Sequence, residues 1–210
     1  MRTSPSVQST FRLSMLVAFA SMPGSPLAQG QESAHWLLRA GLHPVQPKPD
    51  GHSLLSVGDG VAATLAATYM MSPHWGIELM TALPVEHDVK LKSGGQVGNV
   101  KHVPPTLSLQ YRFLEPAGRM RAYVGVGLNY TRFISEHTTG AWAGSKLELD
   151  RSYGPAAQVG FDMDIGETSF IGIDARWFDI DSNATLNGTG LGTLQIDPYA
   201  VGLTIGKRLR

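Results

Sequence analysis

The sequence predicts an all-β fold, an eight-stranded antiparallel transmembrane β-barrel with short periplasmic turns and four longer extracellular loops. Three observations favour this fold. Stretches of about ten residues alternate apolar and polar side chains, short and long connections follow each other in turn, and an apolar segment typical of an export signal lies near the N-terminus. Strands of about 9 to 11 residues can cross a bilayer, and closing them into a barrel leaves no backbone polar group unpaired in lipid.

The alternation is clearest in residues 106–113, TLSLQYRF. Leu107, Leu109, Tyr111 and Phe113 share one face of such a strand, and the polar residues between them share the other. A soluble β-sandwich would alternate too. The barrel is favoured because the predicted strands exceed the usual five to six residues of soluble sheets and because the chain carries an export signal.

Eight segments of this kind follow one another along the chain. We place the strands near residues 35–43, 60–71, 75–86, 103–113, 119–134, 148–165, 169–181 and 195–209. Short turns are predicted at 72–74, 114–118 and 166–168, and long loops at 44–59, 87–102, 135–147 and 182–194. In bacterial barrels the short turns are periplasmic and the long loops extracellular, which fixes the orientation of the chain.

Charged residues within the predicted strands should face the lumen, since Arg or Lys facing lipid near the midplane costs about 2 to 4 kcal/mol. Because side chains alternate along a strand, this requirement selects one face for each strand. The predicted lumen charges are Glu78, Arg112, Asp162, Asp174 and Arg176. Buried charges need partners, so we expect these side chains to pair with one another and to obstruct the flow of water.

Composition limits the functional classes that remain. The chain has 210 residues, 17 Lys plus Arg, 17 Asp plus Glu, and no cysteine. The balanced charge and the absence of a basic cluster interleaved with aromatics argue against nucleic-acid binding. Without cysteine there is no disulfide framework, thiol nucleophile or Cys-based metal site. No cofactor is predicted.

The first residues read as a secretory signal peptide, in which Arg2 and Arg12 precede an apolar run at 13–20. The run is far shorter than the roughly 20 residues of a membrane-spanning helix. Cleavage after Ala20 or after Ala28 remains open from the pattern. We therefore divide the chain into a signal peptide at 1–28 and an outer-membrane β-barrel domain at 29–210.

Several segments, taken in order, resemble the OmpW family of small outer-membrane barrels. They are HWLLRAG at 35–41, WGIELMTALPVEH at 75–87, VKHVPPTLSLQYRF at 100–113, RAYVGVGLNYTRF at 121–133, SYGPAAQVGFDMDI at 152–165, ARWFDID at 175–181 and IDPYAVGLTIGKR at 196–208. The resemblance implies a monomeric barrel in the cell outer membrane with a hydrophobic pocket. It also implies the passage of small hydrophobic molecules, captured by the external loops and released sideways into the membrane.

The alternative function is a plugged structural barrel whose extracellular loops act as an adhesin or as a receptor for phage or toxin. For a transport path we select apolar residues of the extracellular half. They are Leu54, Leu55, Val57, Met80, Phe133, Trp142 and Phe178. Pro104 and Pro105 begin a predicted strand and can donate no ladder hydrogen bond, so with Pro84 they are candidates for a lateral gap in the wall. Simple punctuation of the strand is the other interpretation of these prolines.

Metal sites and catalysis find little support in the sequence. His87 and His102 could approach each other across adjacent strands, and Asp179, Asp181 and Asp197 could bind a hard cation, but neither group has a tight ligand spacing. No Gly-x-Ser-x-Gly elbow is present, and we place no Ser-His pair on one inward face. The chain is therefore not expected to be an enzyme or to hold a metal.

The expected partners are outer-membrane lipid, lipopolysaccharide, small hydrophobic solutes and the barrel-assembly machinery. Members of the family usually end in an aromatic residue that this machinery reads. The present sequence ends in Leu209 and Arg210. We expect replacement of Leu209 by Phe with removal of Arg210 to raise the amount of membrane-embedded protein if this difference limits assembly.

Overall fold

The computed structural model describes residues 36–47, 55–91, 93–113 and 119–209, and within these it describes only the backbone of 55–57, 85–87 and 135–136. All of them belong to one compact unit, Ser33–Arg210. The predicted signal peptide lies outside the described residues. Among the described residues, no helix is both long and apolar enough to cross a membrane.

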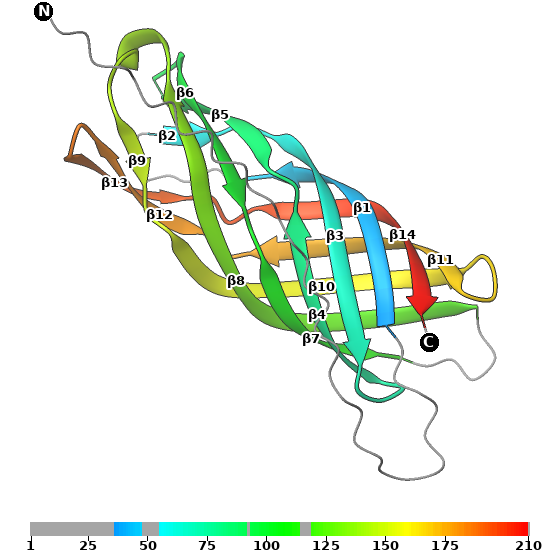
Figure 1. The fold of residues 1–210 in the computed structure, drawn as a ribbon. Helices are drawn as coiled ribbons and strands as arrows, with labels where there is room; N and C mark the ends of the chain where they lie inside the picture. Colours follow the sequence, from blue (N-terminus) through cyan, green and yellow to red (C-terminus); the bar gives the residue numbers. More distant parts are fainter. Residues whose placement is uncertain (1–35, 48–54, 92, 114–118, 210) are drawn as a thin grey trace, which may run out of the picture. The chain divides into compact units, whose positions relative to one another are not determined.

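Eight long strands form the wall of a closed antiparallel barrel, as the sequence predicts. They are β1 (Trp36–Gln46), β3 (Gly60–Met70), β4 (Trp75–Ala82), β7 (Thr106–Arg112), β8 (Met120–Thr138), β10 (Ser152–Asp164), β11 (Ser169–Phe178) and β14 (Tyr199–Leu209). Each pairs with the next in this order, and β14 pairs with β1 to close the ring. Figure 1 shows the β3–β4 and β10–β11 turns at the same end of the barrel as the end of β14.

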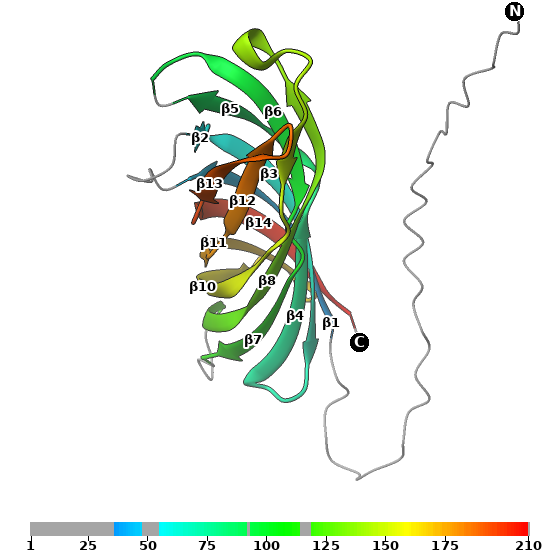
Figure 2. The same cartoon turned by 90° about the vertical axis from the view of Figure 1, so that its left-hand side faces the viewer.

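Shorter strands extend the structure beyond the opposite end of the barrel. They are β2 (Leu55–Val57), β5 (Val85–Leu91), β6 (Gln96–Val103), β9 (Leu147–Leu149), β12 (Asp181–Leu186) and β13 (Thr189–Gln195), together with one 3-10 turn, η1 (Gly140–Trp142). Strands β2, β5 and β6 continue the sheet from β8, whereas β9, β12 and β13 form a separate sheet. Figure 2 shows the β5–β6 hairpin and β8 reaching past the barrel at one end, with β4 and β7 toward the other.

This extension differs from the expectation that residues 87–102 and 182–194 are loops, because most of them form hairpins. The hairpin β5–β6 turns at Gly94 and Gly95, both with positive φ. The hairpin β12–β13 turns at Asn187 and Gly188, again both with positive φ. An Asn-Gly pair is a strong signal for such a two-residue turn, so the second hairpin was readable from the sequence.

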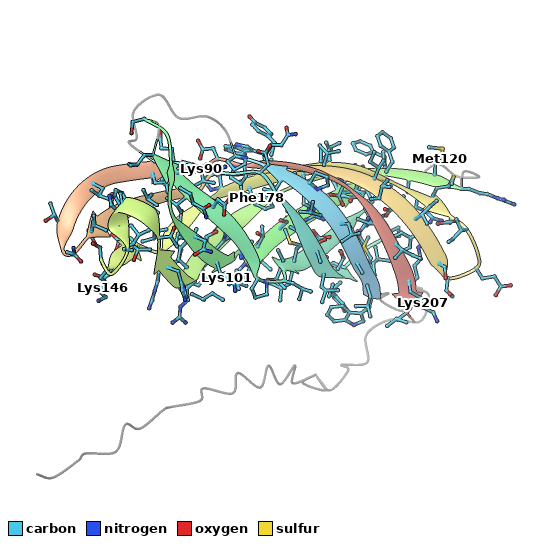
Figure 3. The ribbon with its side chains drawn as sticks, turned by 90° about the horizontal axis from the view of Figure 1, so that it is seen from above. Lys90, Lys101, Met120, Lys146, Phe178 and Lys207 are labelled. Atoms are coloured by element: carbon cyan, nitrogen blue, oxygen red, sulfur yellow. The ribbon has the colours of Figure 1, made fainter. Side chains whose placement is uncertain are left out.

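The outer wall of the barrel is apolar, as alternation requires. Leu128 on β8 and Leu203 on β14 are 72% and 71% exposed, whereas their neighbours Asn129 and Thr204 are only 2% and 5% exposed. Aromatic side chains cluster toward the end that carries the short turns, where the Trp75 ring packs on Tyr111 with ring centroids 5.0 Å apart. Figure 3 shows side chains that project from the barrel along its upper and lower edges in that view. The exposed apolar surface is the face a bilayer would cover.

A hydrophobic core fills the junction between the barrel and its extension. It joins barrel residues to residues of both extra sheets, and its buried members are Ala66, Met80, Val89, Val97, Val100, Phe133, Leu147, Leu149, Ala156, Phe178, Ile180, Ala184, Leu194 and Ile196. Trp142, of η1, packs against this core. The extracellular mouth is therefore covered by packed side chains in this structure.

Candidate functional site

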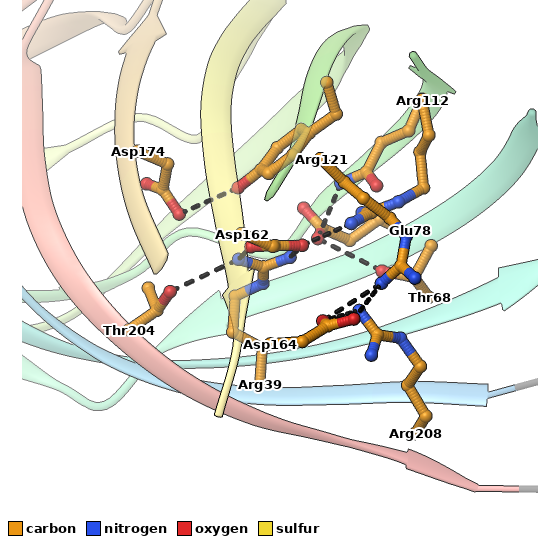
Figure 4. A network of polar contacts seen from close by, with 12 residues as sticks. Arg39, Thr68, Glu78, Arg112, Arg121, Asp162, Asp164, Asp174, Thr204 and Arg208 are labelled. Atoms are coloured by element: carbon orange, nitrogen blue, oxygen red, sulfur yellow. Dashed lines mark hydrogen bonds and ion pairs between the residues drawn. The ribbon is translucent and has the colours of Figure 1, made fainter. Parts of the chain in front are cut away.

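Two groups of buried, ion-paired side chains lie in the lumen; Figure 4 shows Arg39, Arg112 and Asp162 of the first and Glu78 and Asp174 of the second. The first, the Asp162 group, consists of Asp162 on β10, Arg39 on β1 and Arg112 on β7. Arg39 Nη1 and Nη2 donate to the two carboxylate oxygens of Asp162 at 2.7 and 3.0 Å. Arg112 Nη2 donates to Asp162 Oδ2 as well. All three residues are at most 5% exposed.

The second, the Arg176 group, consists of Arg176 and Asp174 on β11 with Glu78 on β4. Arg176 Nη1 donates to Glu78 Oε1 at 3.0 Å, and Arg176 Nε donates to Asp174 Oδ1 at 3.0 Å. Gln110 adds a bond from Nε2 to Glu78 Oε2 at 2.8 Å. His43 on β1 also contacts this group, because its Nε2 lies 2.8 Å from Asp174 Oδ1.

Tyr123 on β8 connects the two groups. Its ring lies 5.0 Å from the guanidinium carbons of both Arg39 and Arg112. Its hydroxyl donates to Asp174 Oδ2 at 3.2 Å. The face of the Tyr123 ring stabilises the two guanidinium groups, and the Tyr123 hydroxyl donates to the Asp174 carboxylate. One buried tyrosine therefore interacts with members of both groups. The three arginines and three carboxylates balance in charge, and their side chains obstruct the lumen.

The structure places every predicted lumen charge inside the barrel, and it adds Arg39 and His43, which sequence reasoning missed, and Tyr123, whose place in the alternation already predicts an inward position. Arg39, His43 and Tyr123 are respectively 5%, 1% and 0% exposed. Arg39 follows Leu37 and Leu38, so the apolar pattern does not say which face of β1 is inward. The charge of Arg39 is the one signal that could have assigned the face, since it is costly in lipid.

A small cavity of about 40 Å³ lies next to the Arg176 group. Two of the predicted path residues, Met80 and Phe178, line it together with His43, Thr64 and Arg176. The remaining lining residues are Val45, Ala62, Ala82, His102, Pro104, Ile180, Pro198 and Ala200. The cavity is therefore apolar on most sides and polar where it meets the ion pairs.

The other predicted path residues lie in different places. Phe133 belongs to the hydrophobic core above the lumen, and Trp142 packs on that core, so neither lines the cavity. Leu54 lies outside the described residues. Leu55 and Val57 lie on β2, which pairs with β5, and only their backbone is described.

The wall is interrupted near the predicted lateral gap. Strand β4 pairs with β7 up to Met80 and Thr106, and pairing resumes at Val85 and His102 between β5 and β6. Within the described pairings, residues 81–84 and 103–105 have no partners across this seam. Their other sides stay bonded, since Leu83 N donates to Ala63 O at 2.8 Å and Tyr130 N donates to Pro105 O at 2.9 Å. Pro84, Pro104 and Pro105 thus flank one interruption in the ladder.

An apolar groove of about 830 Å³ follows the outer wall beside this interruption. It crosses β14, β1 and β3 and ends at Leu83. None of its lining residues carries a charge; they are Ala40, Gly41, Leu42, Pro44, Val61, Ala63, Thr64, Leu65, Leu83, Ile173, Val201, Gly202, Leu203, Thr204 and Ile205. The groove is suited to hydrocarbon.

The structure brings together one of the two groups of residues considered as weak metal sites. Register pairs His102 with Val85 and His87 with Val100, so the two histidines occupy diagonal positions on β6 and β5, and of His87 only the backbone is described. Asp179, Asp181 and Asp197 do come together, with carboxylate oxygens within 4.8 Å of one another. Burial, followed by the charges of Asp197 and Asp181, raises the pKa of Asp179 above the ordinary value of an aspartate.

Comparison with known proteins agrees with this fold. The sequence model of the OmpW family matches residues 38–208. The chain belongs to the OmpW family. Outer membrane protein W of Vibrio cholerae is 34% identical over 184 residues, covering 81% of this chain and 84% of that protein. Membership in this family and the barrel architecture together make the chain an outer-membrane protein.

Two further OmpW-like proteins bear on structure and function. The crystal structure of the outer membrane protein OprG from Pseudomonas aeruginosa superposes with a TM-score of 0.74 at 26% identity, covering 86% of this chain and 98% of that one. The dibenzothiophene metabolism operon protein DoxH of Pseudomonas sp. (strain C18) is 26% identical, covering 71% of this chain and 72% of that protein.

Proposed function

We propose that this OmpW-family barrel admits small hydrophobic molecules from the cell exterior and releases them sideways into the outer membrane. The observation that carries the proposal is the position of the inner cavity. It lies against the ion pairs that obstruct the lumen and is bounded by Ala82 and Pro104, which belong to the interrupted seam. A solute in this cavity meets charge toward the periplasm and an unpaired stretch of wall toward the lipid.

The outer groove supports the lateral direction. A solute leaving between residues 81–84 and 103–105 passes Leu83, where the apolar groove ends. Burying apolar surface of a solute against such a groove is favourable by about 25 cal/mol for each Å² removed from water. The route is therefore downhill for a hydrocarbon and uphill for a polar solute, because the outer groove is lined by uncharged and mostly apolar residues.

The relative named for a dibenzothiophene metabolism operon supports the same substrate class. Dibenzothiophene is an apolar aromatic molecule, and a cell that metabolises such a compound must bring it across the outer membrane. An eight-stranded barrel is too narrow for a wide aqueous pore. Passage along an apolar path is consistent with that limit.

Uptake into lipid vesicles tests the proposal. We expect vesicles containing the full chain to take up an apolar aromatic compound faster than empty vesicles, and to show no gain for a sugar of similar size. Replacing both Pro104 and Pro105 by Ala should restore ladder donors at the seam and slow apolar uptake several-fold. Pro155→Ala, on the outer face of β10, is the matched control and should leave uptake unchanged. Equal uptake by all three proteins would refute lateral release.

A receptor or adhesin is the second candidate function. It is favoured by the β12–β13 hairpin, whose exposed Asn183 and Thr193 bond to each other at 2.9 Å on a surface that points away from the core. Binding of phage or of host matrix to cells that make the protein, without any apolar uptake in vesicles, would favour this function over transport.

We also propose that the barrel works as a monomer, surrounded by membrane lipid and lipopolysaccharide, after insertion by the barrel-assembly machinery. The apolar outer wall supports lipid contact on the eight barrel strands. Sedimentation of the protein in detergent would test the monomer, with a dimer mass as the contradicting result.

A further inference from the structure

We propose that the inner cavity selects apolar molecules that carry a neutral hydrogen-bond donor, such as an alcohol or phenol, over carboxylates with the same hydrocarbon tail. This inference rests on the proposed function for its biological use, since it names the solute class. Binding itself can be measured independently of transport. Three features of the cavity carry the inference: its local charge, the direction of its hydrogen bonds and its size.

The charge of the lumen is balanced in total but divided unevenly. In the Asp162 group two arginines face one carboxylate, whereas in the Arg176 group two carboxylates face one arginine. The cavity is lined by Arg176 and His43, which contact Asp174, and by no member of the Asp162 group. In this half of the network the two carboxylates outnumber the arginine, and Arg176, the charged side chain that lines the cavity, is paired with both, so an anionic head group must compete with them for it.

His43 is held in a fixed orientation by the backbone around it. A Cβ on Gly41 would lie 2.7 Å from the His43 Cε1 atom, and a Cβ on Gly202 would collide with the other side of the ring. The imidazole fills the space that these two glycines leave open. Its Nε2 lies 2.8 Å from Asp174 Oδ1, and its Nδ1 lies 3.1 Å from Thr64 Oγ1.

The direction of these bonds follows from their partners. Asp174 already accepts bonds from Arg176 and from the Tyr123 hydroxyl, as an ionised carboxylate does. The Nε2 of His43 must then carry the proton that it donates to Asp174. In a neutral imidazole, Nδ1 is left as the acceptor, so the Thr64 hydroxyl donates to it. Once this proton is committed, Thr64 Oγ1 can offer the cavity only its lone pairs.

Thr64 Oγ1 is therefore an acceptor in the cavity wall, beside an arginine that is already paired with two carboxylates. A solute hydroxyl can donate to Thr64 Oγ1, whereas an ether has no proton to donate and a carboxylate is repelled. The cavity volume of about 40 Å³ slightly exceeds the volume of about 30 Å³ that one water molecule occupies in the liquid. The space fits a hydroxyl head, and a longer tail requires the buried side chains of Met80 and Phe178, which line the cavity, to move apart.

Met80 provides a direct probe of occupancy, because its side chain is 3% exposed and lines the cavity. The full chain, labelled with ¹³C at methionine methyl groups and held in lipid nanodiscs, would be titrated with octanol, octyl methyl ether and octanoate at about pH 7, where a carboxyl group is ionised. We expect the Met80 signal to report about fivefold tighter binding of octanol than of the ether, the worth of one hydrogen bond. Octanoate should bind about tenfold more weakly than octanol, or less.

Variants assign the selectivity to Thr64. Thr64→Val should bring octanol binding down to that of the ether, and Thr64→Ser, which keeps the hydroxyl, should retain the difference. Thr131→Val is the matched control, since Thr131 is buried in the same lumen, bonds to Asn129 at 2.7 Å and does not line the cavity. The control should keep the fivefold preference. Heat-modifiable migration in electrophoresis would show that each variant is folded.

The outcomes separate this inference from the proposed function. Binding of octanoate equal to that of octanol, an unchanged preference in Thr64→Val, or no Met80 response to octanol would each overturn the inference. Selective binding without vesicle uptake of any apolar compound would overturn transport and leave the selectivity standing. Uptake that does not distinguish alcohol from carboxylate would support transport and refute the selectivity.

Discussion

Arg39 contributes a charge to the lumen that its neighbours cannot replace. Its two bonds to Asp162 are supported by the rings of Tyr123 and Phe170, whose centroids lie 5.0 and 5.1 Å from its guanidinium carbon. Removing one partner of a buried ion pair leaves the other charge without full compensation. The stability of the barrel should therefore depend on this side chain.

We expect Arg39→Met to lower the free energy of unfolding by about 3 kcal/mol, because Asp162 would keep only Arg112 as a cationic partner. Urea unfolding in lipid vesicles, followed by tryptophan fluorescence, measures the change. The control is Arg208→Met. Arg208 pairs with Asp164 at 2.7 Å, but their side chains are 20% and 19% exposed, so the loss should stay below about 1 kcal/mol. Equal losses would contradict this difference.

Gly202 tests how tightly the imidazole of His43 is packed. An added Cβ would collide with Leu42 O and with the His43 ring, so Gly202→Ala should lower the free energy of unfolding by about 2 kcal/mol. Gly190→Ala on β13 is the control, because nothing lies within 4 Å of its added Cβ. Thermal unfolding of both variants gives the comparison. A neutral Gly202→Ala would show that His43 moves freely.

Side-chain directions were predictable wherever a charge marked the inward face. Asp162 and Asp174 fixed their strands in this way, and both are buried. Their partners were not predictable, because the pairing of Asp162 with Arg39 joins residues 123 positions apart through the closure of the barrel. Nothing in the sequence indicates the role of Thr64, because that role depends on the ring of His43, which lies beside it only in the folded barrel.

At the level of elements, the connection between β11 and β12 concentrates negative charge. The raised pKa of Asp179 means that its protonated form is favoured in the folded state. Its contribution to stability is then fully present at low pH and is lost as the pH rises through the folded-state pKa. The backbone nearby should loosen with it, because Ile180 N donates to Asp197 Oδ1 at 3.2 Å.

We therefore expect the hydrogen-exchange protection of Ile180, corrected for the intrinsic rate, to fall as the pH rises above the ordinary range of an aspartate. Asp181→Asn removes one of the repelling charges and should flatten this dependence. Glu148→Gln, which alters an exposed residue paired with Lys146, should leave it unchanged. An identical pH dependence in all three proteins would show that the acidic cluster does not govern the connection.

The barrel strands could be predicted from the sequence, and Asn187-Gly188 signals the β12–β13 hairpin of the extension, but the β5–β6 hairpin has no comparable signal. Lipid forces every outward residue of a spanning strand to be apolar, so the pattern is strict. Strand β6 buries Val97 and Val100, which are not two residues apart, because its pairing with β5 skips Val97. Such a pattern is hard to distinguish from that of a loop.

At the scale of the whole molecule, the packed mouth should limit access to the cavity. Trp142 covers the core from η1, so Trp142→Ala should loosen this cover and raise the vesicle uptake of an apolar compound several-fold. Trp177→Ala, on the lipid face of β11, is a control of the same residue type. Lower uptake in Trp142→Ala would mean that the tryptophan guides solutes instead of covering the entrance.

The paired charges of the lumen also have a consequence for the cell that makes this protein. Because the three arginines and three carboxylates of the two groups are buried and paired across the lumen, a small ion entering from outside would have to give up its hydration shell where side chains already fill the space. The barrel should be electrically silent in a planar bilayer. A bacterium could then carry many copies of the protein without ion leakage across its outer membrane and without admitting hydrophilic antibiotics. Entry through the protein would depend on how soluble a molecule is in hydrocarbon instead of on its size.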